Sequence, residues 1–403
     1  MNYMKFTVTT SFYNGEQYID RLYQSLKNQT YSNWEWIVTD DWSQDNAKEK
    51  LIELAANDRK VKYVEQSKKK EMFWNPQVFC PDAEIVVQLD VDDLIHAKAL
   101  EVYAHFFTKF PNIIAINCAQ THIMRPDGAW DCYVCIDYRK DNNMSAGQMV
   151  FLRAFRNNPN LKLDFNPGDW MQFFYNDLSM MCVLEEHGKI LNLHRTLYSY
   201  TRRKDSISHS DSDDLPAVRK ENADLMTLIK GRRDNDNLDT LERYFYPVQD
   251  LASLFVDQDF SCMDTQQKVS LISSEKSAYK KKLLKELYFD HDINFNLISP
   301  DVDWYFFRIE NWEDYELLEK HFDEVATTQK QLCIQVIIAS SDNLDIVSRN
   351  GAPSFPPDYG VFREKVSKFI SERFFHTYHD LSHYIIKVYG DEIKEKLNKN
   401  LFR

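Results

Sequence analysis

Glycine is scarce in this chain, with nine in 403 residues, and long apolar runs are missing. The scarcity argues against glycine-rich phosphate loops as the main device for holding a ligand. A transmembrane helix needs about 20 consecutive apolar residues, and no window of the sequence supplies them. The opening MNYMKFTVTTSFYNG has a strand pattern and lacks the basic start and apolar run of a secretory signal. The sequence therefore predicts no transmembrane segment and a cytoplasmic location, with peripheral attachment to a membrane left open.

Basic charge and paired cysteines are also in short supply. Lys and Arg number 49 against 62 Asp and Glu, which gives a formal net charge of -13. Nucleic-acid binding relies on basic side chains that neutralise phosphates, so this balance argues against a nucleic-acid partner. Seven scattered cysteines are an odd number, which favours reduced thiols. Cys132 and Cys135 form one CxxC pair, but no second pair completes a zinc site.

Apolar residues, by contrast, are plentiful at 43%, and the length of the chain suggests two or three domains. Over residues 1–210, short apolar runs alternate with segments of helical periodicity. In one of these segments Ile19, Leu22, Tyr23 and Leu26 form the stripe of an amphipathic helix. Strands are expected at residues 5–10, 34–39, 61–65, 84–89 and 113–118. The alternation predicts an α/β fold with a mostly parallel sheet flanked by helices.

Polar clusters follow three of the expected strands, at Tyr13-Asn14, at Asp40-Asp41 and at residues 90–93. Ligands of such sheets bind outside the carboxyl ends of the strands. Carboxylates there can hold Mg²⁺ or Mn²⁺ together with a substrate diphosphate. The alternative is a solvated acidic turn or a helix cap. The position of residues 90–93 directly after an apolar strand favours the binding role.

Four motifs then occur in order: Ser11-Phe12-Tyr13-Asn14, LKNQTY at residues 26–31, WIVTDDWS at 36–43 and LDVDD at 89–93. In order and spacing they resemble the opening half of family 2 glycosyltransferases, over roughly residues 5–110. The resemblance implies the GT-A fold. It also implies metal-dependent transfer of a sugar from a nucleotide diphosphate sugar, usually a UDP-sugar, to an acceptor hydroxyl in glycan or polysaccharide synthesis. Inversion at the anomeric carbon and an Mn²⁺ or Mg²⁺ cofactor follow from the same resemblance.

The resemblance also assigns roles to individual residues of the donor half. The residues that it places on the nucleotide sugar are Ser11, Tyr13, Asn14, Asp41, Asp90 and Asp92. It makes Asp93 the nearer metal ligand of a DXD-type motif, with Asp92 beside it.

The acceptor half carries a looser resemblance, which places Asp177 at the start of a helix as the catalytic base. An inverting enzyme needs one carboxylate to accept the proton of the attacking hydroxyl. A carboxylate at a helix start is also a common cap, so Asp169 and Glu185 stay open as alternatives.

A late polar loop offers cations for the diphosphate. Arg202, Arg203 and His209 lie in this loop, and Arg203 is nearest the position that the family uses. His209 is a further candidate metal ligand. The choice among the three stays open.

Beyond the first domain, residues 211–403 are expected to form an accessory domain of unknown role, mostly helical with one β-α-β unit. The unit comprises residues 304–309, 314–325 and 332–339, while helices are expected up to about residue 285 and over 362–375 and 381–397. The domain could bind an acceptor, which we expect to be a glycan, a lipid-linked sugar or a protein. It could also join two copies of the chain in a homo-oligomer.

Two other classes of function compete with the transferase. A nucleotidyltransferase would prefer a glycine-rich basic loop after the first strand, and residues 11–15 are not one. A non-catalytic sugar- or protein-binding module would be expected to have lost its acidic motif, but Asp92 and Asp93 are intact.

Overall fold

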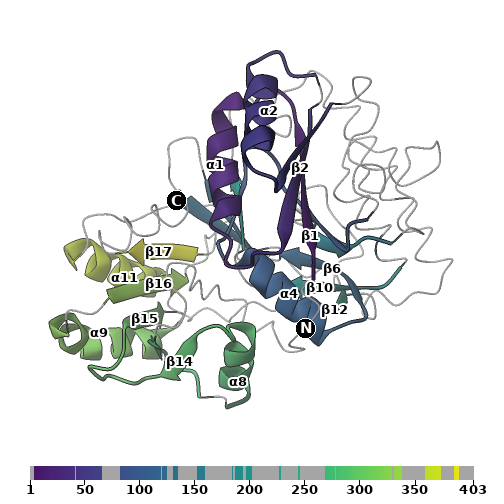
Figure 1. Ribbon diagram of the computed structural model, residues 1–403. Helices are drawn as coiled ribbons and strands as arrows, with labels where there is room; N and C mark the ends of the chain where they lie inside the picture. Colours follow the sequence, from purple (N-terminus) through teal and green to yellow (C-terminus); the bar gives the residue numbers. More distant parts are fainter. Residues whose placement is uncertain are drawn as a thin grey trace.

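The structure is a computed structural model of the whole chain. It describes residues 4–40, 42–65, 82–118, 120–124, 130–134, 152–158, 184, 187–193, 197–201, 227, 244–245, 268–276, 278–309, 311–328, 331–337, 359–373 and 385–389. Three sheets with their helices make up this part of the chain (Figure 1).

The largest sheet has eight strands within these ranges, in the order β12-β10-β6-β9-β4-β1-β2-β3. In that order they are Tyr244–Phe245, Lys189–Leu193, Ile113–Cys118, Leu152–Arg156, Ile85–Gln88, Phe6–Phe12, Trp34–Asp40 and Val61–Glu65. Neighbouring strands run parallel, except that β9 is antiparallel to both β4 and β6. The prediction of an α/β fold with a mostly parallel sheet is confirmed.

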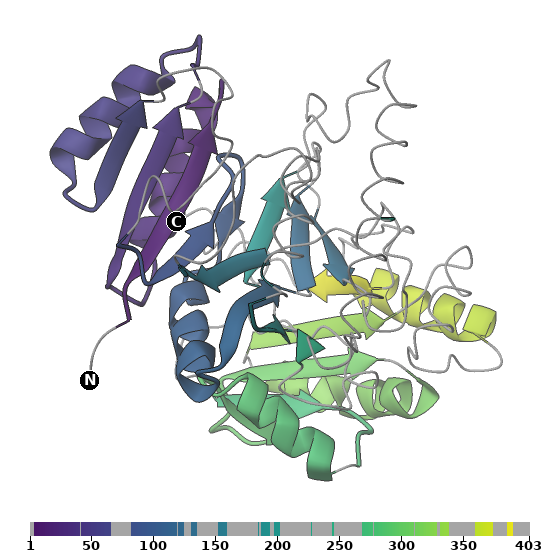
Figure 2. The ribbon, with the colours of Figure 1, turned by 90° about the vertical axis from the view of Figure 1, so that its right-hand side faces the viewer.

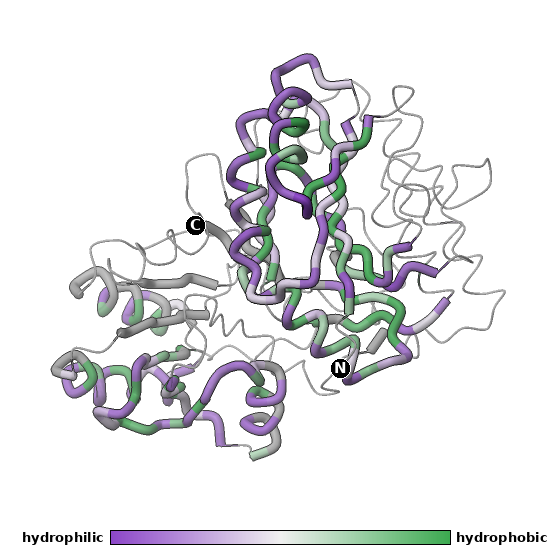
Figure 3. Tube along the Cα trace, in the orientation of Figure 1, coloured by the Kyte–Doolittle hydropathy of each residue, from purple (hydrophilic) through white to green (hydrophobic). Residues whose placement is uncertain are grey.

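Three helices accompany this sheet: α1 (Glu16–Lys27), α2 (Ala47–Asn57) and α4 (Ala99–Lys109). Helix α1 forms where the apolar stripe predicts it, and Ile19, Leu22 and Leu26 are fully buried. Helices α1 and α2 lie on the same face of β1, β2 and β3 (Figure 2), and both carry hydrophilic as well as hydrophobic residues (Figure 3). No helix within the described ranges is long and apolar enough to cross a membrane.

A four-stranded sheet lies beside the first, in the order β5-β11-β7-β8. Its strands are Leu94–Ile95, Tyr198–Thr201, Gln120–Met124 and Trp130–Val134. Strand β5 directly follows the acidic motif and pairs antiparallel with β11. A further backbone bond, from His96 N to Leu197 O at 2.9 Å, extends that pairing. The sheet thus ties residues near 200 to the acidic motif.

The C-terminal part forms a third sheet, in the order β14-β13-β15-β16-β17. These strands are Asp292–Phe295, Lys268–Ile272, Trp304–Ile309, Gln331–Ile337 and Ile385–Tyr389. Its helices are α8 (Ala278–Leu287), α9 (Trp312–Thr327) and α11 (Tyr359–Arg373). The predicted β-α-β unit is confirmed by β15, α9 and β16, and α11 matches the helix expected over 362–375.

The prediction of helix was wrong for two short segments of this region. Residues 268–272 form β13, because their buried apolar side chains pack between β14 and β15 in a parallel sheet. Residues 385–389 (IIKVY) form β17, where a run rich in β-branched residues pairs antiparallel with β16.

The third sheet is packed against the first part of the chain through α4. The ring of His105 on α4 stacks on Phe289 at 3.7 Å between centroids. Lys98 Nζ and Asp290 Oδ2 form an ion pair of 2.8 Å, with both side chains only 5% exposed. One apolar core also runs from the first sheet into the third. Tyr244–Phe245, which lies beyond the boundary expected at residue 210, adds a strand to the first sheet.

Candidate functional site

The carboxyl ends of β1, β2 and β4 meet at one edge of the first sheet. Strand register sets Phe12 opposite Asp40 and Thr9 opposite Gln88. From β1 the chain moves outward to β2 and β3, and it returns on the other side of β1 as β4. The order of strands therefore reverses between β1 and β4, which is where open α/β sheets bind ligands. The polar clusters that follow these strands share this edge, as predicted.

The acidic motif forms a tight turn directly after β4, in which Asp93 N donates to Asp90 O at 3.1 Å. Its three carboxylates differ in exposure: Asp90 is exposed, Asp92 is 9% exposed and Asp93 is fully buried. The β1–α1 turn packs against this turn, because a methyl group added at Gly15 would lie 3.1 Å from Val91 Cγ1. The acidic turn and the β1–α1 turn are therefore in direct contact.

Both carboxylate oxygens of Asp93 are engaged by strand β11. Thr201 N donates to Oδ1 at 2.7 Å, and the hydroxyl of Tyr198 donates to Oδ2. Tyr198 is itself fully buried. Hydrogen bonds to a buried carboxylate are strong, because one partner carries full charge. Asp93 thus holds the acidic turn against β11.

Arg21 of α1 joins the same cluster. Its Nη2 donates to the backbone oxygen of Asp92 and, at 3.0 Å, to Thr201 Oγ1. Burial lowers the pKa of Arg21, although the nearby Asp93 and Asp92 carboxylates oppose that shift. The guanidinium thereby bridges α1, the acidic turn and β11. Only weak signals in the sequence point to these partners: Arg21 is next to the apolar stripe of α1, and Tyr198 begins the short segment YSYT.

Hydrogen bonds join the turn after β1 to the turn after β2. Asn14, with a left-handed φ of 48°, donates its backbone N–H to Ser43 Oγ at 3.1 Å. Its side-chain oxygen accepts from Gln44 N at 2.7 Å. Tyr13 is 48% exposed. The buried Ser11 Oγ has no hydrogen-bond partner among the described residues.

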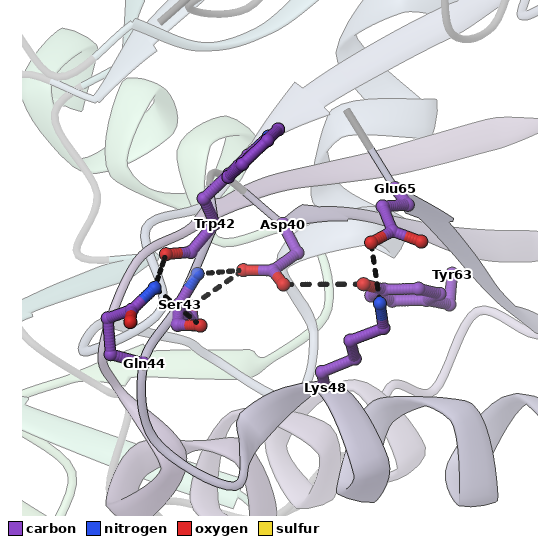
Figure 4. A network of polar contacts seen from close by, with 7 residues as sticks. All are labelled: Asp40, Trp42, Ser43, Gln44, Lys48, Tyr63 and Glu65. Carbon is purple, nitrogen blue, oxygen red and sulfur yellow. Dashed lines mark hydrogen bonds and ion pairs between the residues drawn. The ribbon is translucent and has the colours of Figure 1, made fainter. Parts of the chain in front are cut away.

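Asp40 holds the second of these turns in shape (Figure 4). It is 3% exposed, and its Oδ1 accepts from Ser43 N at 3.1 Å and from Ser43 Oγ at 2.6 Å. The hydroxyl of Tyr63 donates to Oδ2 at 3.3 Å. Burial, followed by the charge of Asp40, raises the pKa of Tyr63 well above its usual range. Asp40, the first residue of the Asp40-Asp41 pair, therefore stabilises the turn after β2 through its bonds to Ser43 and Tyr63.

Several predicted site residues lie outside the described residues. They are Asp41, Asp169, Asp177, Glu185, Arg202, Arg203 and His209. Within the described part of the chain, no group of three or more His, Cys, Asp or Glu side chains is gathered to hold a metal ion. The structure places Ser11, Tyr13, Asn14, Asp90, Asp92 and Asp93 at the same edge of the first sheet, where β1 and β4 end.

Fold and edge together define an α/β domain with polar side chains at the carboxyl ends of its strands, which is where such domains bind their ligands. The sequence profile described as Glycosyl transferase family 2 matches residues 7–158, which cover these strands and the acidic motif. Residues 7–158 therefore match the family 2 glycosyltransferases, and over this stretch the resemblance seen in the ordered motifs is confirmed.

Two curated relatives match shorter stretches. An uncharacterized glycosyltransferase of Haemophilus influenzae is 31% identical over 115 residues, which are 28% of this chain and 35% of that protein. The Escherichia coli UDP-Glc:alpha-D-GlcNAc-diphosphoundecaprenol beta-1,3-glucosyltransferase WfgD is 32% identical over 97 residues, 24% of this chain and 38% of WfgD. The chain thus spans little more than a third of the length of each relative.

Solved structures overlap more widely but loosely. S. aureus TarS 1-349 in complex with UDP-GlcNAc has a TM-score of 0.38 at 20% identity, over 55% of this chain and 66% of TarS 1-349. The mannosyltransferase PcManGT from Pyrobaculum calidifontis, in complex with GDP-Man and Mn²⁺, has a TM-score of 0.39 at 17% identity, over 58% of this chain and 66% of PcManGT.

Proposed function

We propose that the chain is a metal-dependent glycosyltransferase that moves a sugar from a nucleoside diphosphate sugar to an acceptor hydroxyl with inversion. The placement of Asp90 and Asp92 at the switch point, in a turn whose Val91 packs against the β1–α1 turn, carries this proposal. A diphosphate site needs oxygen ligands for a cation beside a surface for the nucleoside, and this edge offers both. A UDP-linked donor is the first choice, since the name of the E. coli relative specifies UDP-Glc.

We place the divalent cation on Asp92 and Asp90. Their carboxylates are the hard oxygen ligands that Mn²⁺ and Mg²⁺ share with phosphate groups, and they are more accessible than Asp93. Asp93, which the resemblance makes the nearer ligand, is fully buried against Tyr198 and Thr201, so we assign it the positioning of the turn. When bound, the cation offsets the negative charge that develops on the leaving diphosphate.

The nucleoside belongs on the β1 side of the edge. Tyr13 presents an aromatic ring that is half exposed, and stacking on a base suits such a ring. The hydroxyl of Ser11 is buried and has no hydrogen-bond partner among the described residues, and we propose that a polar group of the ligand supplies one. Asn14 holds this part of the edge in place through its hydrogen bonds to Ser43 and Gln44 in the turn after β2. Asp41 stays the proposed partner of the base or ribose.

The acceptor half is proposed from the resemblance. Asp177 takes the role of base and accepts the proton of the attacking hydroxyl, with Asp169 and Glu185 as alternatives. Arg203 neutralises diphosphate charge, and His209 is the remaining candidate metal ligand. A lipid-linked acceptor is the first of the three acceptor classes to test, because the name of WfgD specifies a sugar on diphosphoundecaprenol.

We keep the boundary between a GT-A domain (1–210) and an accessory domain (211–403) as a proposal. A third sheet of its own supports a separate C-terminal unit. The shared apolar core and the buried Lys98–Asp290 pair indicate that the two units are firmly joined. The accessory unit would therefore move little against the donor site.

A donor screen tests the proposal. Purified protein is incubated with UDP-, GDP- and dTDP-sugars and either Mn²⁺ or Mg²⁺, and release of nucleoside diphosphate is measured. We expect release from one donor class that depends on the metal and is lost in Asp92→Asn. The matched control is Asp20→Asn, which also removes a carboxylate but from a side chain 75% exposed on α1. Release that survives in Asp92→Asn, or from no donor at all, would contradict the proposal.

A further inference from the structure

Trp42 has an unusual backbone for so large a residue. Its φ is 63°, in the left-handed region. Glycine adopts this backbone conformation without steric cost, whereas a residue with a bulky side chain is strained there. Strain of this kind persists only where the surrounding structure imposes it, and it gathers at functional sites. The observation therefore calls for a role that a glycine at the same position would not fill.

Hydrogen bonds on both sides of Trp42 impose this conformation. Ser43, the next residue, bonds Asp40 through both its backbone N–H and its hydroxyl. Gln44 Nε2 donates to the backbone oxygen of Trp42 at 3.1 Å. Asn14 then ties Ser43 and Gln44 to the turn after β1. These bonds fix the turn without using the indole, which points away from the Asp40–Ser43 contacts (Figure 4).

The indole lies at the edge of the sheet that we propose as the donor site. Trp42 follows the carboxyl end of β2, and Tyr13 follows the end of β1, its neighbour in the sheet. The Asn14–Ser43 bond joins residues directly next to these two aromatics. Trp42 is 49% and Tyr13 48% exposed. Among the described residues the other large exposed hydrophobics, Ile52, Leu297 and Val361, are aliphatic and lie on other segments.

We propose that Trp42 is a further donor-binding residue, whose indole stacks on the nucleobase of the donor. This inference rests on the proposed function and extends it to a residue outside the acidic motif. An aromatic kept for the core would be buried, whereas this one is half exposed and held in a strained turn beside a second exposed aromatic. Stacking requires an aromatic ring that the ligand can reach, and about half of the surface of Trp42 is exposed on this fixed turn.

Replacing Trp42 by glycine separates binding from folding. Glycine accepts a φ of 63° without strain, so we expect the melting temperature of ligand-free Trp42→Gly to equal or exceed that of the wild type. We expect its Kd for UDP with Mn²⁺ to rise by roughly 5- to 100-fold, the range of a lost aromatic stack. Trp42→Phe, which keeps a flat ring, should stay within about fivefold of the wild type.

Two further measurements make the test specific. Inorganic pyrophosphate with Mn²⁺ has no base to stack, so its Kd should be the same for wild type and Trp42→Gly. Ile52→Ala, which removes an exposed apolar side chain 47% accessible on α2, should bind UDP as the wild type does. Should Trp42→Gly melt lower than the wild type, Trp42→Asn repeats the comparison, since asparagine tolerates the left-handed region.

The outcomes separate the two proposals. If the wild type binds no nucleoside diphosphate with metal, the proposed function fails and this inference fails with it. If the wild type binds UDP and Trp42→Gly binds it equally well, only the role of Trp42 is overturned. Equal weakening of UDP and pyrophosphate would also overturn it, because Trp42 would then support the turn instead of the base.

Discussion

Replacing Asp93 by asparagine should destabilise the protein, because this buried carboxylate holds the acidic turn against β11. It is fully buried, and both of its oxygens accept hydrogen bonds, one from Thr201 N and one from the hydroxyl of Tyr198. In Asp93→Asn the amide oxygen can still accept from Thr201. The amide N–H₂ then faces Tyr198, whose hydroxyl must turn round to accept.

The size of the loss follows from the charge that disappears. A hydrogen bond to a charged group contributes about 1.5–3 kcal/mol and a neutral one about 1 kcal/mol, so two such exchanges cost roughly 1–4 kcal/mol. The carboxylate's own burial penalty is relieved. At the same time Arg21, whose pKa burial already lowers, loses a nearby counter-charge, and these two changes oppose each other. Asp93→Ala should cost more, since it leaves the donors from Thr201 and Tyr198 without an acceptor.

Thermal unfolding followed by tryptophan fluorescence measures this loss. A domain of about 200 residues shifts by roughly 2–4 °C per kcal/mol, so Asp93→Asn should melt about 2–16 °C below the wild type. Asp90→Asn is the control, because Asp90 is exposed and surface changes stay within about 0.5 kcal/mol. An Asp93→Asn protein that melts within 2 °C of the wild type, or no lower than Asp90→Asn, would refute this reasoning.

Two more predictions concern the scaffold. Lys98→Met removes the ammonium partner of the buried Asp290 carboxylate, which His291 Nε2 also faces at 3.6 Å, and should cost about 3–5 kcal/mol in a denaturant titration. Lys109→Met, at a half-exposed pair, should cost about 0–1 kcal/mol. Equal losses in the two variants would contradict the coupling of α4 to the third sheet. Burial, helped by Asp58, raises the pKa of Tyr23 to about 12. Unfolded tyrosine ionises near pH 10, so this part of the stability is present below about pH 10 and is lost as pH rises towards 12. Tyr23→Phe should flatten that decline, and an unchanged pH profile would count against the assignment.

Much of the donor edge could be predicted from the sequence, because its signals are local. The apolar runs at β1, β2 and β4, each followed by polar residues, suffice to place Tyr13 and residues 90–93 at one edge of a parallel sheet. The period of α1 likewise follows from residues three and four positions apart. These patterns need no knowledge of distant contacts.

The contacts within the site could not be predicted in the same way. Asp93 looks like an accessible acid in the sequence, and its burial depends on Tyr198, 105 residues away. Arg21 meets the backbone of Asp92 across 71 residues. Strand β17 was missed for a related reason, since strand pairing depends on a partner far along the chain more than on local preference. Such long-range pairs have no signature in a single sequence.

The central claim is that the edge between β1 and β4 binds a nucleoside diphosphate through a metal held by Asp92. A thermal-shift titration of UDP, with and without Mn²⁺, tests it on the wild type and on Asp92→Asn. A ligand at 100 times its Kd stabilises the folded state by about 2.7 kcal/mol, so the wild type should melt roughly 5–11 °C higher with both ligands present. That shift should vanish without Mn²⁺ and in Asp92→Asn. The same shift in Asp92→Asn, or no shift with any nucleoside diphosphate, would contradict the claim.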